Sequence, residues 1–83
     1  MIDPTAVREL QVRYLRKEGR SVAVLRAVAH GGSCVVEAEV FSPVGEFPAR
    51  PGPFTFAGER EATAFITDAV EALMYLGCDV QAQ

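Results

Sequence analysis

The sequence is poor in the residues that secreted and metal-binding proteins need. It contains two cysteines, Cys34 and Cys78, one histidine and no asparagine. This number of cysteines and histidines is too small for a disulfide framework or a zinc site. We therefore expect two reduced thiols and no bound metal. Without asparagine the chain has no acceptor site for N-linked glycans.

A long hydrophobic run is also absent. No window approaches the roughly 18 uninterrupted apolar residues of a membrane-spanning helix. The first 20 residues carry eight charged side chains, which is untypical of a secretory signal peptide. A chain of 83 residues has room for one hydrophobic core. We therefore predict a single small domain over residues 1–83, cytoplasmic and without a membrane partner.

Nothing in the sequence indicates a catalytic site. His30 and Cys34 flank a turn, but the strand pattern described below sends them to opposite faces, so they do not form a base and nucleophile pair. The acidic pair Glu37/Glu39 has no predicted cleft around it, and the glycines never take the spacing of a phosphate-binding loop. We predict that the chain is not an enzyme and holds no cofactor.

The first half of the chain instead contains two glycine turns in a valine-rich stretch. Glu18-Gly19 and Gly31-Gly32 have the form of two-residue hairpin turns. Before the first turn, Asp3-Pro4 and Gly19 fit the two ends of a helix. Residues 9–14, however, alternate between polar and apolar, as a strand does. The strand interpretation is favoured because the two turns, placed independently, produce one continuous apolar face.

That pairing predicts a register for both hairpins. With Lys17 opposite Arg20, Tyr14 is expected to face Ala23. The predicted core face consists of Leu10, Val12, Tyr14, Ala23, Leu25, Ala27, Val36, Ala38 and Val40.

The opposite face of the predicted sheet carries an apolar stripe with charges at intervals. Arg26 is expected there, between Gln11 and Glu37, and Glu37 is its natural cross-strand partner. We predict this face as an interaction surface with another protein. Its residues are Leu15, Val22, Val24, Arg26, Val28, Val35 and Phe41.

Residues 42–58 contain four of the five prolines and connect the meander to the last part of the chain. A third turn is expected at 42–45. A short fourth strand is expected at 46–49 or at 54–56, and the prolines place it at a sheet edge.

A helix is predicted from Glu59 to Leu76, where apolar residues recur at spacings of three and four. Gly77 is its expected stop. The stripe predicted to lie on the sheet consists of Phe65, Ala69, Leu73 and Leu76. The fold class is thus α+β: a three- to four-stranded antiparallel meander followed by one C-terminal helix that covers one face of the sheet and leaves the other bare.

These features predict a small non-enzymatic protein-binding or regulatory domain. Its partner is another protein or a second copy, so that a homodimer would bury the bare sheet face.

The alternative function is that of a nucleic-acid-binding regulator. Residues 1–30 have a charge balance of +3 and residues 31–83 one of −6. The expected nucleic-acid contacts are Arg13, Arg16, Lys17, Arg20 and Arg26. Antiparallel strands followed by a helix resemble, in topology, the Whirly and related single-strand-binding coactivator folds. This resemblance implies binding of single strands.

Overall fold

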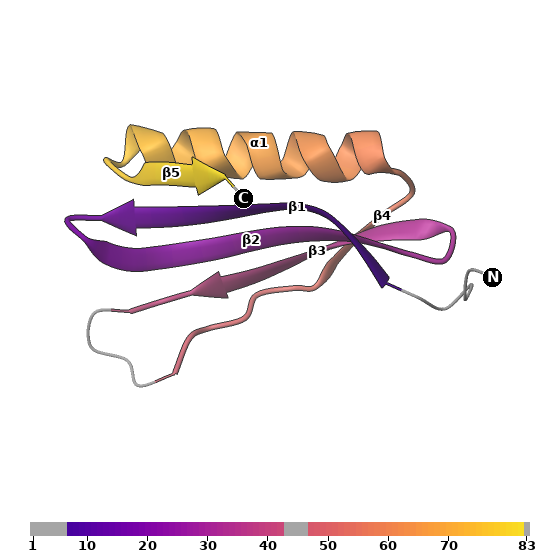
Figure 1. The fold of residues 1–83 in the computed structure, drawn as a ribbon, viewed down its shortest axis with the longest axis horizontal. Helices are drawn as coiled ribbons and strands as arrows, with labels where there is room; N and C mark the ends of the chain where they lie inside the picture. The colour runs from indigo at the N-terminus through magenta and orange to yellow at the C-terminus, as the bar shows by residue number, and fades with distance from the viewer. Residues whose placement is uncertain (1–6, 43–46, 83) are drawn as a thin grey trace.

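The structure is a computed structural model that describes residues 7–42 and 47–82. Its elements are β1 (Val7–Lys17), β2 (Arg20–His30), β3 (Ser33–Val40), β4 (Phe54–Phe56), α1 (Glu59–Tyr75) and β5 (Asp79–Ala82). The strands form one antiparallel sheet in the order β4-β3-β2-β1-β5, and α1 runs alongside it (Figure 1). The predicted α+β class is confirmed, with five strands in place of three or four.

The first hairpin turn is formed by Glu18 and Gly19, as predicted. Both residues have positive φ, 53° for Glu18 and 78° for Gly19. Two successive positive φ angles are the mark of a type I′ turn, whose twist matches that of paired strands. Glycine takes this conformation without a steric penalty. Glu18 does not, because the Cβ of an L residue is crowded by the following carbonyl oxygen in the left-handed region.

Replacing Glu18 by asparagine should therefore stabilise the fold. Asparagine tolerates the left-handed region, and Asn-Gly is a strongly preferred pair for this turn. Because the left-handed region costs an ordinary residue about 1–2 kcal/mol, we expect Glu18→Asn to raise the free energy of unfolding by about 0.5–1 kcal/mol. Urea denaturation followed by circular dichroism measures the change. The control Glu71→Asn, at an exposed position of α1, should instead lower stability slightly. A lower stability for Glu18→Asn would contradict this argument.

The second hairpin has the predicted register throughout. His30 pairs with Ser33, Arg26 with Glu37 and Ala23 with Val40. Gly31 has a φ of 63°, as the first central residue of a type II′ turn requires. Arg26 and Glu37 therefore lie side by side on adjacent strands, on the face that points away from α1.

The first hairpin departs from the predicted register in its middle. Its ends agree, with Lys17 opposite Arg20 and Glu9 opposite Val28. Between them the partners shift by one residue, so Tyr14 lies opposite Val24 instead of Ala23. Val12 and Tyr14 thus share the outer face with Val24. Their prediction as core-facing side chains is wrong.

Two β-bulges, one on each strand, produce the shift. Val22 is the extra residue of β2, and Leu10 is the extra residue of β1. The first bulge displaces the register by one residue and the second restores it, because they lie on opposite strands. As a result Leu15 lies opposite Ala23 and is fully buried. Val22 and Leu10 themselves pack, partly buried, against the core.

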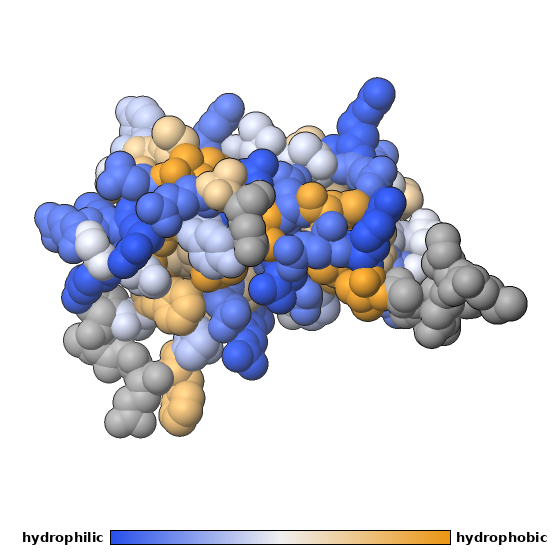
Figure 2. All heavy atoms as spheres, in the orientation of Figure 1, coloured by the Kyte–Doolittle hydropathy of each residue, from blue (hydrophilic) through white to orange (hydrophobic). Residues whose placement is uncertain are grey.

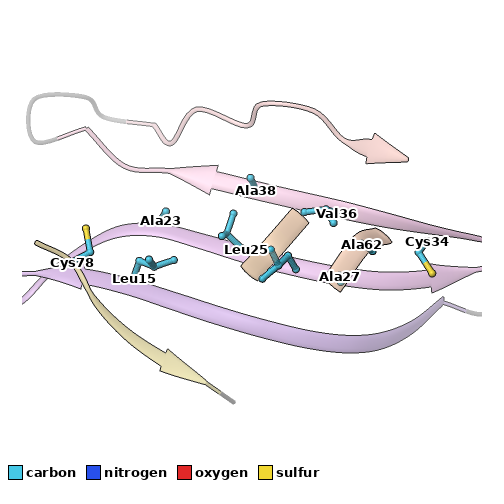
Figure 3. Packing of buried hydrophobic residues seen from close by; sticks show 10 residues of the cluster. Leu15, Ala23, Leu25, Ala27, Cys34, Val36, Ala38, Ala62 and Cys78 are labelled. Carbon is cyan, nitrogen blue, oxygen red and sulfur yellow. The ribbon is translucent and has the colours of Figure 1, made fainter. Parts of the chain in front are cut away.

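The core lies between the sheet and α1 (Figure 3). Two small residues of the central strand, Ala23 and Ala27, belong to the same buried cluster as Ala62 and Ile66 of α1, and small side chains let the two layers approach closely. The buried members are Leu15, Ala23, Leu25, Ala27, Cys34, Val36, Ala38, Ala62, Ile66 and Cys78.

The edge strand β4 is the second of the two predicted alternatives. Phe54 and Phe56 both pack on Phe65 of α1. The ring centroid of Phe65 lies 5.0 Å from that of Phe54 and 5.3 Å from that of Phe56. Ala49 forms a single bridge to Val40, with both backbone hydrogen bonds at 2.8 Å. The third turn, predicted at 42–45, includes residues 43–45, which lie outside the described part of the chain.

The helix ends in a Schellman motif. Gly77 has a φ of 99°. The N–H of Cys78 donates to the carbonyl of Leu73 at 3.0 Å, and the N–H of Gly77 donates to that of Met74 at 2.9 Å. Gly77 is thus the stop that the sequence predicts. Leu76, predicted to lie on the sheet, is 65% exposed because the chain leaves the helix at this point.

After Gly77 the chain returns to the sheet as β5, which the sequence analysis missed. β5 pairs antiparallel with residues 13–16 of β1. This return places Cys78 in the core, 7% exposed, beside the end of β1 that carries Leu15.

Candidate functional site

The candidate site is the outer face, which we define as the side of the sheet opposite α1. Among the described residues, α1 is the one helix, and it packs on the other side. Side chains alternate along each strand, so Val12 and Tyr14 of β1, Val24 and Arg26 of β2, and Val35 of β3 point to the outer face. Val28, Glu9, Glu37 and Glu39 share this face.

The valines of the outer face are more buried than expected. Val12 is 1% exposed and Val28 is 7% exposed, whereas Val24 and Val35 are half-buried. The valine surface that remains open on this face is therefore that of Val24 and Val35. Val24 borders a hollow of about 290 Å³, which is lined by Val24, Arg26, Glu37, Ala38, Glu39, Arg50, Pro51 and Pro53.

The charged side chains around this hollow are mostly paired. The Nε of Arg26 lies 3.2 Å from a carboxylate oxygen of Glu9, and Arg50 lies 3.4 Å from Glu39. Glu37, the predicted partner of Arg26, stands beside it in register but has no ion pair within the described residues. Glu9 is a diagonal neighbour of Arg26 on the same face, because it lies opposite Val28, two residues further along β2.

The predicted interaction residues do not all share this face. Val24, Arg26, Val28 and Val35 do. Leu15 does not: it is fully buried in the core, so its assignment to an exposed face is corrected. Val22 packs toward the core at its bulge. Phe41 follows the end of β3 and lines a separate hollow of about 490 Å³ beside the first turn, with Lys17, Glu18, Arg20, Ser21, Val22 and Ser42.

The predicted nucleic-acid contacts are spread over three places. Arg13 lies opposite Leu25, on the helix side of the sheet, and donates to the carbonyl of Val12 at 2.9 Å. Arg26 lies on the outer face. Arg16, Lys17 and Arg20 gather at the first turn. One continuous basic surface through all five is therefore not formed.

The sequence does not predict the hollow beside Val24, because one of its walls is built by the proline-rich connection that follows β3. Arg50, Pro51 and Pro53 follow the bridge between Ala49 and Val40. The prolines indicated a stiff connection, but no local signal places that connection beside β3.

The groups that could carry catalysis or bind a metal are dispersed. Cys34 and Cys78 are free and buried, at opposite ends of the core (Figure 3). His30 is exposed and pairs with Ser33, whereas Cys34 faces the core, as predicted. Over residues 7–42 and 47–82, no three His, Cys, Asp or Glu side chains are grouped so that they could hold a metal ion.

None of the helices in the described ranges is long and apolar enough to cross a lipid bilayer. On the side drawn in Figure 2, hydrophobic surface occurs in small areas separated by hydrophilic side chains.

No family model matches the chain, and searches of curated proteins and of solved structures return no match.

Proposed function

We propose that this chain is a small non-enzymatic, protein-binding domain of regulatory type, which docks a second copy or another protein on its outer face. One observation carries the proposal: α1 covers one side of the sheet, and the half-buried Val24 lies in an open hollow on the other side. An open sheet face with an apolar centre and a charged surround has the composition of a protein interface.

The size of the outer face indicates that binding is transient. β1 and β2 have 11 residues each and β3 has 8. At about 3.3 Å per residue and about 4.8 Å between strands, the three strands outline roughly 500 Å². A standard interface buries about 800 Å² on each partner. Since Val12 and Val28 are already buried, little further apolar area can be gained, and we expect self-association to be weak.

A charge at the centre of the outer face should abolish this association. We expect wild-type protein to show an average mass that rises with concentration in sedimentation equilibrium, toward that of a dimer. Val24→Asp should keep the monomer mass at every concentration, because it buries an unpaired charge in the interface. The loss of stability should stay small, since Val24 lies outside the core cluster.

The matched control is Val40→Asp, at a valine that is 41% exposed on the helix side of the sheet. It should leave the association unchanged. A wild-type protein that stays monomeric while Val24→Asp unfolds as a core variant does would contradict the proposal.

The nucleic-acid function remains a prediction. The distribution of the five basic residues over three places favours the protein-binding proposal over it.

A further inference from the structure

The last turn of α1 exposes three consecutive large apolar side chains. Met74 is 49% exposed, Tyr75 93% and Leu76 65%. Single exposed hydrophobic residues are ordinary on a protein surface, whereas three large ones at the end of one helix are an unusual concentration of exposed apolar side chains. These three residues lie apart from the outer face, because they belong to the helix on the other side of the sheet.

Three basic residues lie at the same end of the molecule. Arg16, Lys17 and Arg20 flank the first turn, and Figure 1 shows this turn and the C-terminal end of α1 at one end of the fold. The Nζ of Lys17 donates to the carbonyl of Leu76 at 3.1 Å, which joins the two groups directly. We call this surface, formed by Arg16, Lys17, Arg20, Met74, Tyr75 and Leu76, the end surface.

The three cations of the end surface form no ion pair within the described chain. Arg8, Arg26 and Arg50 each have a carboxylate within ion-pair distance, whereas Arg16, Lys17 and Arg20 have none among residues 7–42 and 47–82. Arg16 and Lys17 donate instead to the carbonyls of Gly19 and Leu76. These carbonyls position the two side chains, and that of Leu76 belongs to the C-terminal end of α1, where the helix dipole favours a cation; neither carbonyl removes the net charge of the side chain that it binds.

We infer that the end surface docks a segment of a partner protein that presents acidic side chains beside an apolar one. Charge complementarity decides the occupant. A second copy bound symmetrically through this surface would bring like charges together, which costs binding energy. A membrane or a nucleic-acid strand presents negative charge uniformly, and would meet Glu18 and Asp79 at the same end as well. A protein segment with discrete carboxylates can pair with the three cations and avoid these two acids.

The residue types agree with this assignment. Tyrosine, methionine and arginine are enriched at protein interfaces, and tyrosine is a frequent centre of binding energy. Tyr75, almost fully exposed, is the expected anchor, together with Arg20, whose side chain forms no hydrogen bond or ion pair among the described residues. This inference is independent of the outer face, so either proposal can fail without the other.

Selection from a phage-displayed library of random dodecapeptides on immobilised wild-type protein tests the inference. We expect enriched peptides with acidic residues next to a leucine, isoleucine or phenylalanine. Fluorescence anisotropy of a synthetic selected peptide should then show binding about tenfold weaker for Tyr75→Ser and for Arg20→Glu. Both side chains are exposed, so both variants should retain the wild-type circular dichroism spectrum.

Arg60→Glu, the same charge reversal at an exposed residue in the first turn of α1, is the matched control and should leave the affinity unchanged. Enriched peptides without acidic residues, or affinities that neither Tyr75→Ser nor Arg20→Glu changes, overturn the inference. Tighter binding of labelled oligo-dT or of phosphatidylserine vesicles, lost in Arg20→Glu and steeply weakened by salt, overturns it in favour of a polyanion.

Discussion

Replacing Leu15 by alanine should lower the free energy of unfolding by about 2–5 kcal/mol, the range for a leucine removed from a packed core. Leu15 has no exposed surface and lies in the core cluster with Ala23 and Cys78. A domain of this size has a total stability of the same order, so the variant should be partly unfolded at 37 °C. Urea denaturation followed by circular dichroism measures the loss.

This substitution also tests the pair of bulges. In a hairpin without bulges Leu15 would lie on the outer face, and its truncation would cost well under the core range. The matched control is Leu76→Ala, at a leucine that is 65% exposed, which should change stability by less than about 0.5 kcal/mol. Equal effects of Leu15→Ala and Leu76→Ala would show that β1 does not follow the shifted register.

The bulges mark the boundary of what the sequence could predict for the fold. Turn residues have local signatures, so both hairpins and the Gly77 stop were predictable. A bulge has no comparable signature at Leu10 or Val22, because any residue can be the extra one when packing favours it. The alternating pattern of β1 placed Tyr14 in the core. In the structure Leu15, and not Tyr14, is buried in the core. The two compensating bulges make this possible, because they turn Leu15 to the core face.

The second hairpin shows the opposite case. The turn sets its register, and the pairing continues without a bulge from His30–Ser33 to Ala23–Val40. The face assignments of Cys34 and Arg26 were predictable there because one turn and one alternation determine them. For β5 no such rule was available, because its four residues contact β1 from a distance of more than 60 positions along the chain.

The candidate site was predictable only in its centre. Val24, Arg26 and Glu37 lie on the outer face because of the second hairpin. Alternation places both Glu9 and Glu37 on the face of Arg26 but does not determine which of them forms the ion pair, and it does not place Arg50 beside the hollow. The end surface depends on tertiary contacts as well. Its basic residues precede its apolar ones by more than 50 positions, and the bond from Lys17 to Leu76 joins them.

The two proposed binding surfaces lie on different parts of this small domain. The outer face lies on the side of the sheet away from α1, whereas the end surface includes the last turn of α1. A partner bound to the outer face and a partner bound to the end surface would therefore not compete for the same side chains. Val24→Asp and Tyr75→Ser should separate the two proposed interactions, since each substitution changes one surface and lies outside the core cluster.

Replacing Ala27 by leucine should destabilise the fold by about 1–3 kcal/mol, because extra methylenes in a packed core force side chains and backbone out of their preferred positions. Ala27 is 1% exposed on the central strand, under α1, and Ala62 on the helix has no exposed surface. The control Ala72→Leu introduces the same side chain on the exposed side of α1 and should be nearly neutral. Thermal unfolding of the two variants compares them directly. If Ala27→Leu were as stable as Ala72→Leu, the helix could not lie as close to β2 as the small residues allow, and the packing of α1 on the sheet would have to be revised.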